Sequence, residues 1–358
     1  MKFGPVATKD AAGTVLAHSL RVTSCKQNKV YRIAKGTTLT TEHINDLVAD
    51  QHSQVVVARF GADDVEENKA ATRLANAIAP LAESLGLRVS GAGAGRVNLY
   101  AMQVGIVLID EAVVMAINAI DPMITIATVP QYHRTDTDSM VATIKIISYA
   151  VSDKALLKAE AASGVASGSA IRVLPPHYKT ATLIETQVGD DVPSIKGRAA
   201  MQGRLDRLGV DLLPRIVVAH DETEIAQAMN EASGEVVFLL TASATSDPLD
   251  VGPQALRKTG GYVTGFGMPV DPGNLLFFGD LGAKPVIGLP GCARSPALNG
   301  ADWVLERLIC GIKLTQADIS AMGVGGLLKE IPTRPKPRAS PIEDISIVGF
   351  QRASSHHC

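Results

Sequence analysis

Aromatic side chains are scarce in this sequence, at 4% of its 358 residues, so any core must be built from Val, Ile, Leu and Ala. That composition favours buried parallel strands packed against helices over an aromatic-centred sandwich. The four cysteines contain no CxxC pair, which argues against a disulfide framework or a cysteine-based zinc site. We therefore expect a reduced, cytoplasmic protein.

The sequence is also close to electrically neutral and has no long uninterrupted apolar run. The formal net charge is −2, so the chain has no global field that would hold nucleic acid or an anionic membrane. The most apolar stretch, 104–120, is interrupted by Asp110 and Glu111, and the N-terminus lacks the apolar segment of a signal peptide. An anionic ligand must be bound locally, by main-chain amides and a few basic side chains.

Several common catalytic motifs are absent as well. The sequence contains no GxxxxGKS, GxxxxGKT, HExxH or GxSxG pattern, which argues against P-loop, zincin and serine-hydrolase chemistry. The glycine-rich segment 91–95 lacks the GxGxxG spacing of a dinucleotide site.

The length of the chain predicts two or three domains. Residues 1–60 read as a small β-rich domain, with strands at 14–17, 30–33 and 54–59 and a helix at 41–48 capped by Thr40 or Thr41. Residues 61–154 read as an α+β middle domain that opens with one helix over 64–86, ended by Gly86.

From residue 155 to 330 the pattern turns regular. Apolar strands alternate with amphipathic helices, which predicts right-handed βαβ crossovers and a three-layer α/β/α domain with a parallel sheet. The predicted strands are 180–185, 215–219, 235–240 and 285–289, and the predicted helices are 195–208, 222–232, 253–259 and 296–309. Residues 331–358 read as a Pro-rich linker and a disordered tail.

Ligands of such a sheet bind beyond the carboxyl ends of its strands. After the strand 235–240 comes Thr241-Ala-Ser-Ala-Thr-Ser-Asp-Pro-Leu-Asp250. Its small hydroxyl residues suit a phosphate or oxyanion, and its two aspartates could hold Mg²⁺ or position a metal oxyanion. The alternative is that an aspartate caps the next helix and the serines merely turn the chain. The candidate residues are Thr241, Ser243, Thr245, Ser246, Asp247 and Asp250.

A second candidate turn is Gly265-Phe-Gly-Met-Pro-Val-Asp-Pro-Gly-Asn274. Pro272-Gly273 matches a type II turn, which can direct main-chain amides at a ligand beside Asn274. A simple hairpin turn before a strand at 275–278 is the alternative.

The third candidate turn is Gly288-Leu-Pro-Gly-Cys-Ala-Arg-Ser-Pro296. Here a strand ends in a tight turn, and Ser295 is predicted to be the N-cap of the helix that Pro296 opens. The amides at that helix start, its dipole and Arg294 would favour a phosphate, beside Pro290 and Gly291. The alternative is an ordinary strand–helix connection with a solvated arginine.

These three turns, in this order, resemble those of the molybdopterin-binding domain of molybdenumtransferases (molybdenum insertases), which serve molybdenum-cofactor biosynthesis. The corresponding segments are 241–250, 269–274 and 289–295, and 36–57 resembles the module that precedes that domain. Segments 266–275, 288–295 and 323–332 are similar to bacterial proteins that fuse this unit to a molybdenum-cofactor nucleotidyltransferase.

The resemblance implies binding of molybdopterin or its adenylylated form, and insertion of molybdenum from molybdate with Asp247 and Asp250 as catalytic and Mg²⁺-binding residues. It also implies a nucleotidyltransferase domain or partner and a homodimer. Insertases usually have paired glycines at 241–243 and lysines beside the Pro-Gly turn, whereas this chain has Thr, Ala and Ser, then Asp271 and Asn274. Two alternatives stay open: a non-catalytic molybdopterin carrier, and an unrelated nucleotide-binding α/β enzyme.

Overall fold

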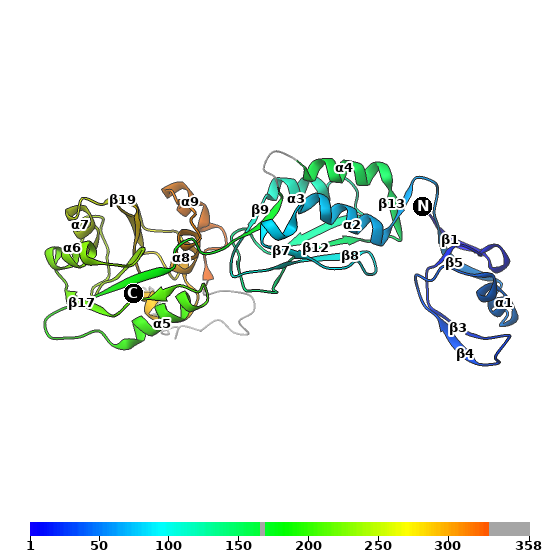
Figure 1. Ribbon diagram of the computed structural model, residues 1–358, viewed down its shortest axis with the longest axis horizontal. Coiled ribbons are helices and arrows are strands. Elements are labelled where there is room, and N and C mark those ends of the chain that lie inside the picture. Colours follow the sequence, from blue (N-terminus) through cyan, green and yellow to red (C-terminus); the bar gives the residue numbers. More distant parts are fainter. Residues whose placement is uncertain (165–168, 329–358) are drawn as a thin grey trace, which may run out of the picture.

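The computed structural model describes residues 1–164 and 169–328. These residues form three units that follow one another along an elongated molecule (Figure 1). We call them the N-terminal unit (1–60), the middle unit (61–174) and the C-terminal unit (175–328), because separate hydrophobic cores lie within them. The predicted linker and tail at 331–358 lies outside the described residues. Within the described ranges, no helix combines the length and the apolar character needed to cross a membrane.

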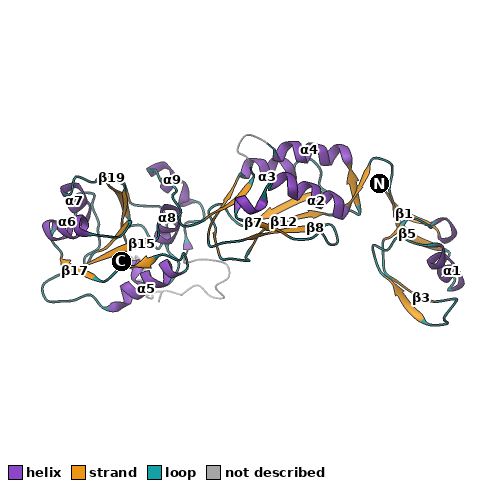
Figure 2. Cartoon of the chain, in the orientation of Figure 1, coloured by secondary structure: helices purple, strands orange, loops and turns teal. Residues whose placement is uncertain are grey.

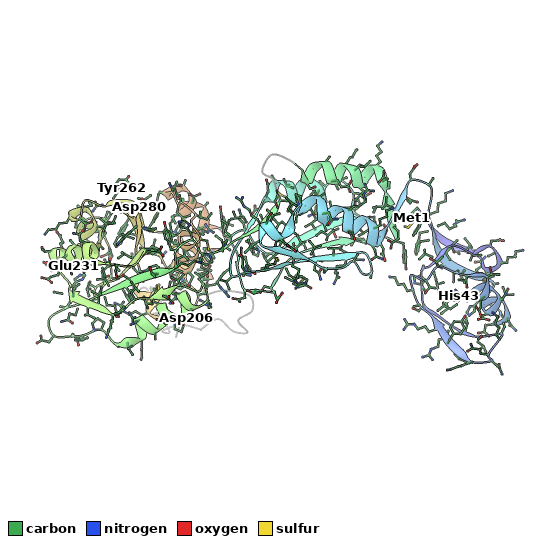
Figure 3. All side chains as sticks on the ribbon, viewed as in Figure 1. Met1, His43, Asp206, Glu231, Tyr262 and Asp280 are labelled. Atoms are coloured by element: carbon green, nitrogen blue, oxygen red, sulfur yellow. The ribbon has the colours of Figure 1, made fainter. Side chains whose placement is uncertain are left out.

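The N-terminal unit is built mainly from antiparallel strands. Its elements are β1 (Lys2–Ala7), η1 (Thr8–Asp10), β2 (Val15–Leu16), β3 (Leu20–Thr23), β4 (Val30–Ile33), α1 (Thr41–Ala49) and β5 (Gln54–Arg59). Strand β5 lies between β1 and β2, and β3 and β4 form a hairpin. Thr40 caps α1 through its side chain, as predicted. The amino group of Met1 forms a 2.8 Å ion pair with Asp64 where this unit meets the middle unit (Figure 3).

The middle unit packs helices on one side of an antiparallel sheet (Figure 1). Its elements are β6 (Asp64–Glu66), α2 (Glu67–Ile78), η2 (Ala82–Leu85), β7 (Leu87–Val89), β8 (Arg96–Ala101), β9 (Gly105–Ile109), α3 (Glu111–Asn118), β10 (Ile124–Thr128), β11 (Arg134–Thr135), β12 (Met140–Ile146), β13 (Ala150–Ser152), α4 (Asp153–Ser163) and β14 (Ile171–Leu174). The main sheet has the order β10-β12-β8-β7, and β9 pairs with β11 and β14.

Two expectations for this region were wrong. The single helix expected over 64–86 is broken after Ile78, because Pro80 disfavours helical backbone at Ala79 and the chain turns through a left-handed Leu81. Gly86 ends η2 with positive φ.

The boundary expected at residue 155 also differs. Helix α4 and strand β14 contribute Leu156, Ala159, Ile171 and Val173 to the core of the middle unit. Because β14 pairs with β9, a partner some sixty residues away in the chain, local periodicity does not reveal this placement. The C-terminal unit therefore begins after Leu174.

The C-terminal unit contains a seven-stranded mixed sheet. Its elements are β15 (Thr180–Gln187), α5 (Ile195–Asp206), β16 (Asp211–Leu212), β17 (Ile216–Ala219), α6 (Glu222–Glu231), β18 (Val236–Leu240), α7 (Val251–Lys258), β19 (Tyr262–Phe266), β20 (Phe277–Leu281), β21 (Lys284–Gly288), η3 (Gly291–Arg294), α8 (Gly300–Ile309), α9 (Gln316–Ser320) and η4 (Ala321–Gly323). The sheet order is β16-β15-β18-β21-β20-β19, and β17 also pairs with β15.

Helices cover both faces of this sheet, which agrees with the predicted α/β character (Figure 2). One face packs against α5, α8 and α9, and the other against α6 and α7. Strands β15 to β18 and β21 are parallel, but β20 and β19 run antiparallel, so the expectation of a parallel sheet was wrong at this edge. The short turn at 282–283 between β20 and β21 permits only an antiparallel pair.

Candidate functional site

The three predicted turns lie at one edge of the C-terminal sheet. Strands β18 and β21 are parallel neighbours, so the turns that follow them leave from the same edge. Strand β20 is antiparallel to β21, which places the turn before β20 at that edge as well. Residues 241–250, 267–276 and 289–295 therefore surround one part of the molecular surface, which we call the turn edge.

The first turn begins inside the protein and ends at its surface. Thr241 and Thr245 are buried, with their hydroxyl oxygens 3.4 Å apart, whereas Ser243 and Ser246 are exposed. The amide of Ala242 donates to the hydroxyl of Thr186, at the end of β15, over 2.7 Å. The buried threonines thus fix the start of the turn, and the exposed serines present hydroxyl groups to solvent.

Both aspartates of this turn bond main-chain amides. Asp250 is the N-cap of α7, and its carboxylate accepts from the amides of Ser246 at 3.1 Å and Val251 at 2.7 Å. Asp247 accepts from the amide of Leu249 at 2.7 Å. Asp250 therefore has the helix-capping role that was the alternative to metal binding. No group of three or more His, Cys, Asp or Glu side chains that could hold a metal ion occurs within residues 1–164 and 169–328.

The third turn differs from its prediction. Residues Gly291–Arg294 form the short 3-10 helix η3, and Ser295 follows it in extended backbone. Helix α8 starts only at Gly300, where Asn299 and Asp302 form a capping box. The prediction that Ser295 caps a helix opened by Pro296 was wrong, because the Asn299 cap supplies the stronger start signal further along the chain.

Arg294 connects the third turn to the first. Its guanidinium group donates to the carbonyl oxygen of Thr241 over 2.5 Å. A Cβ placed on Gly197 of α5 would lie 3.4 Å from Cγ of Arg294, so a glycine at this position lets the arginine stem pass close to the helix. Pro290 is buried and Gly291 is exposed, which leaves the start of η3 facing outward.

The second turn packs against the start of α8. The amide of Gly300 donates to the carbonyl oxygen of Pro272 over 2.8 Å, and the Asn274 side chain donates to the carbonyl of Met268. Gly273 has φ +142°, far from the value near +80° of a type II turn, so that assignment was wrong. Gly273 is buried against Gly300, while Asn274 is exposed at the turn edge.

No family model matches this sequence, and no curated protein matches it. Among solved structures, similarity extends to a molybdopterin biosynthesis MoeA protein from Pyrococcus horikoshii, with 14% identity over 86% of this chain and 75% of that chain, at a TM-score of 0.30. A molybdenum cofactor biosynthesis protein from Pyrococcus furiosus gives 12% identity, 89% and 65% coverage, and a TM-score of 0.22. The protein CinA, of unknown function, from Thermoplasma acidophilum gives 18% identity, 33% and 90% coverage, and a TM-score of 0.25. Since no TM-score here reaches 0.5, these similarities carry no argument about the function of this chain.

Two buried charged residues near the turn edge were missed by the sequence analysis. Glu185, at the end of β15, is 1% exposed and forms a 2.7 Å ion pair with Arg215, which also donates to the carbonyl of Pro193. Arg204 on α5 is 3% exposed and pairs with Asp302 at 2.5 Å. No sequence motif marks these residues, because their partners are distant in the chain.

The buried Arg204 side chain is hydrogen-bonded to the main chain of the third turn and of the residues after it. Its guanidinium donates to the carbonyl oxygens of Ala293 at 2.9 Å, Ser295 at 2.8 Å and Ala297 at 3.2 Å. These bonds hold the carbonyl groups of the segment toward the core and restrict its backbone to one conformation.

Proposed function

We propose that the turn edge binds molybdopterin and that the protein serves molybdenum-cofactor biosynthesis. The observation that carries this proposal is the meeting of the three turns, with Arg294 bonded to Thr241 across two of them. Had the turns that follow β18 and β21 faced opposite edges, one small ligand could not touch both. The resemblance of these turns to those of molybdopterin-binding domains supplies the identity of the ligand.

The phosphate of the pterin would lie between the first and third turns. A guanidinium carries five N–H donors, so Arg294 can keep its bond to Thr241 and still donate to a phosphate. The exposed hydroxyls of Ser243 and Ser246, the start of η3 at Gly291, and Ser295 would add donors. Pro272, Gly273 and Asn274 would border the pterin on the remaining side, next to Pro290.

Asp247 and Asp250 would hold Mg²⁺ together with ligand phosphate oxygens, a donor set that this ion accepts. Bound there, the ion would neutralise phosphate charge. Molybdate would be the substrate of an insertion reaction, and the two carboxylates would position it. The amides of Ser246, Leu249 and Val251 would fix the carboxylates in place meanwhile.

The test is a binding titration of the full chain with molybdopterin, followed by oxidation of the retained pterin and measurement of its fluorescence. Loss of one charge-assisted hydrogen bond costs about 1.5–3 kcal/mol, so Arg294→Gln should weaken binding roughly tenfold to hundredfold. Arg96→Gln replaces an exposed arginine on β8 of the middle unit and serves as the matched control. Failure of the unmodified protein to retain pterin, or equal retention by Arg294→Gln, would rule the site out.

A non-catalytic carrier is the second candidate. It is favoured by the capping role of Asp250, whose two carboxylate oxygens both bond main-chain amides. Molybdate-dependent formation of cofactor separates the candidates, because turnover that needs Mg²⁺ and the Asp250 carboxylate supports insertion, whereas binding without turnover supports the carrier. Tight binding of plain ATP or NAD in place of pterin would instead favour an unrelated nucleotide-binding enzyme.

A further inference from the structure

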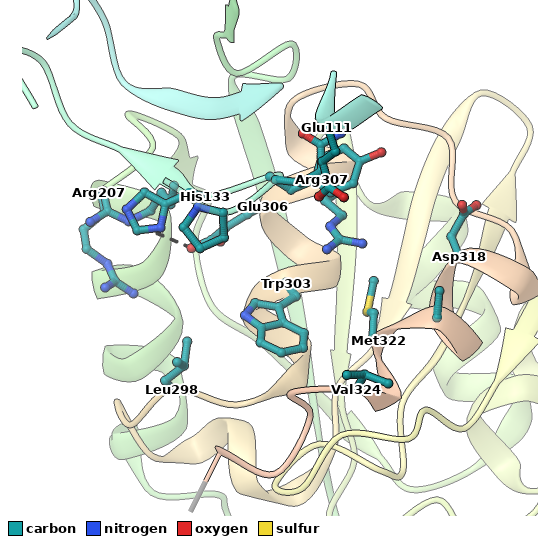
Figure 4. A pocket seen from close by; sticks show the side chains of 15 residues that line it. Glu111, His133, Arg207, Leu298, Trp303, Glu306, Arg307, Asp318, Met322 and Val324 are labelled. Atoms are coloured by element: carbon teal, nitrogen blue, oxygen red, sulfur yellow. Dashed lines mark ion pairs between the residues drawn. The ribbon is translucent and has the colours of Figure 1, made fainter. Parts of the chain in front are cut away.

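A second candidate site lies away from the turn edge, in a cavity of about 780 Å³ between the middle and C-terminal units (Figure 4). The middle unit contributes Glu111 at the start of α3 and residues 130–134 before and within β11. The C-terminal unit contributes side chains of α8 and residues near α9. The volume lies within the range of small-molecule sites, roughly 300–1,000 Å³.

Three arginines from both units line this cavity: Arg134 on β11, Arg207 after α5 and Arg307 on α8. Arg134 is bonded to Asp136 at 2.6 Å. Arg307 lies over the ring of Tyr132, with its guanidinium carbon 4.2 Å from the ring centroid, and its buried Nε has no hydrogen-bond partner in the described structure. A buried donor without an acceptor is costly, so the burial of this Nε atom is not compensated by the contacts within the described residues.

Two aromatic side chains, Trp303 and Tyr132, line the same cavity, and Trp303 is the single tryptophan of the sequence. Tyr132 adopts a left-handed backbone conformation, with φ +62°. Non-glycine residues in this region carry strain of about 1–3 kcal/mol, and such residues gather at functional sites. The strained backbone is therefore at Tyr132, a residue of the middle unit that lines the cavity.

Two carboxylates, Glu306 on α8 and Asp318 on α9, line the cavity together with the three arginines. Burial and the nearby Asp302 raise the pKa of Glu306 to about 7, so this side chain is largely neutral in slightly acidic solution. Asp318 accepts two hydrogen bonds from Thr315, and these bonds lower its pKa and keep it ionised while directing its carboxylate to the start of α9. Among the described residues, Arg134 forms ion pairs with Asp136 and Glu306, whereas Arg207 and Arg307 form none and Arg207 is exposed, so their guanidinium groups are available to a negatively charged group.

We propose that this cavity binds a small organic anion with a planar ring, with the ring against Trp303 and the anionic group near Arg207 and Arg307. Stacking on an indole and a guanidinium–anion bond each add affinity, and one molecule carrying both groups can use them together. Because both units contribute side chains, the bound molecule holds the middle and C-terminal units together. This site is independent of molybdopterin binding at the turn edge.

The experiment uses calorimetric titration of the full chain with four probes. Adenosine monophosphate carries a ring and a phosphate, orotate a ring and a carboxylate, adenosine a ring alone, and inorganic phosphate an anion alone. We expect at least one ring-bearing anion to bind at least about tenfold more tightly than adenosine and phosphate. Comparison of the first two probes distinguishes phosphate from carboxylate as the preferred group. The fluorescence of Trp303 should change on binding, and no other tryptophan contributes to that signal.

Arg207→Gln should weaken this binding at least about tenfold, and because Arg207 is exposed the variant should fold normally. Arg307→Gln should do the same, and Arg96→Gln should not. The proposal is overturned if no probe binds, if inorganic phosphate binds as tightly as the ring-bearing anions, or if Arg207→Gln binds unchanged. Binding lost in Arg294→Gln but kept in Arg207→Gln would assign the anion to the turn edge and overturn it equally.

Discussion

At the scale of single residues, the buried pair between Arg204 and Asp302 ties the turn edge to the core. Both side chains are 3% exposed, and Arg204 also donates to three carbonyl groups, one within η3 and two in the segment after it. Asp302 in turn accepts from the amide of Asn299 in the capping box of α8. A charge removed here leaves its partner buried and unpaired, which is far more costly than losing an exposed pair.

Arg204→Met should therefore lower the free energy of unfolding by about 3–5 kcal/mol, measured by urea denaturation. Arg204→Met combined with Asp302→Leu should recover part of that loss, because no unpaired charge remains. Lys26→Met breaks an exposed ion pair with Glu42 and is the control, with little expected change. A loss in Arg204→Met no larger than in this control would show that the pair contributes little.

Asp250 allows capping and charge to be tested apart. Asparagine is as good an N-cap as aspartate, so Asp250→Asn should keep stability, whereas Asp250→Ala should cost about 1 kcal/mol in thermal unfolding. If Asp250 also binds Mg²⁺, both variants should lose Mg²⁺-dependent activity or binding to a similar degree. Full Mg²⁺ dependence in Asp250→Asn would leave Asp250 a structural cap alone.

The location of a polar residue could be predicted from the sequence where the residue directly follows a buried strand. The shared location of Thr241 and Arg294 at one sheet edge was predictable, because turns that follow neighbouring parallel strands leave from the same edge. The buried positions of Glu185 and Arg204 were not predictable. A charged side chain within a helix or strand is expected to face solvent unless its buried partner, here Arg215 or Asp302, is known. Tyr132 and Trp303 were missed for the same reason, since the middle and C-terminal units meet at residues far apart in sequence.

At the scale of elements, a helix start can be predicted from neighbouring residues, whereas the pairing of strands depends on residues distant in the chain. Helix α6 starts at Glu222 as predicted, because the cap that starts it, Asp221, is its immediate neighbour in the chain. The direction of β20 depends on the short turn that joins it to β21, and the place of β14 depends on β9. The start of α8 was misassigned because Ser295-Pro296 and Asn299 both match a helix start, and packing of Gly300 against Pro272 accompanies the second.

Gly273 tests how closely the second turn must approach α8. A Cβ at this position would lie 2.8 Å from the amide nitrogen of Gly300, and its φ of +142° is unfavourable for other residues. Gly273→Ala should lower the melting temperature and weaken pterin binding together. Gly203→Ala, on α5 with open space around it, should be neutral or stabilising by up to about 1 kcal/mol. Unchanged binding in a folded Gly273→Ala protein would remove this turn from the proposed site.

At the scale of the whole molecule, the middle and C-terminal units are joined by charged and aromatic contacts across the 780 Å³ cavity. Arg134 of the middle unit lies 3.9 Å from Glu306 on α8, and Tyr132 lies under Arg307. The described contact is thus polar and contains a titrating group. Association of the two units should accordingly depend on pH.

The last prediction concerns Glu306, whose pKa is raised from 4.5 to about 7, mainly by burial and by Asp302, against the opposing effect of Arg134, Arg207 and Arg307. Folding favours the neutral form of this group. Its contribution to stability is therefore greatest below about pH 4.5, declines as pH rises to about 7, and is constant above that value.

Glu306→Gln removes this titration, so its stability should fall less between about pH 4 and about pH 8 than that of the unmodified protein, by up to about 3 kcal/mol. Glu111, His133 and Asp318 also face the cavity, and subtracting the two pH profiles cancels their shared titration. Glu83→Gln, on the exposed part of η2, is the control. Parallel pH profiles for Glu306→Gln and the unmodified protein would mean that Glu306 ionises as readily in the folded chain as in the unfolded one.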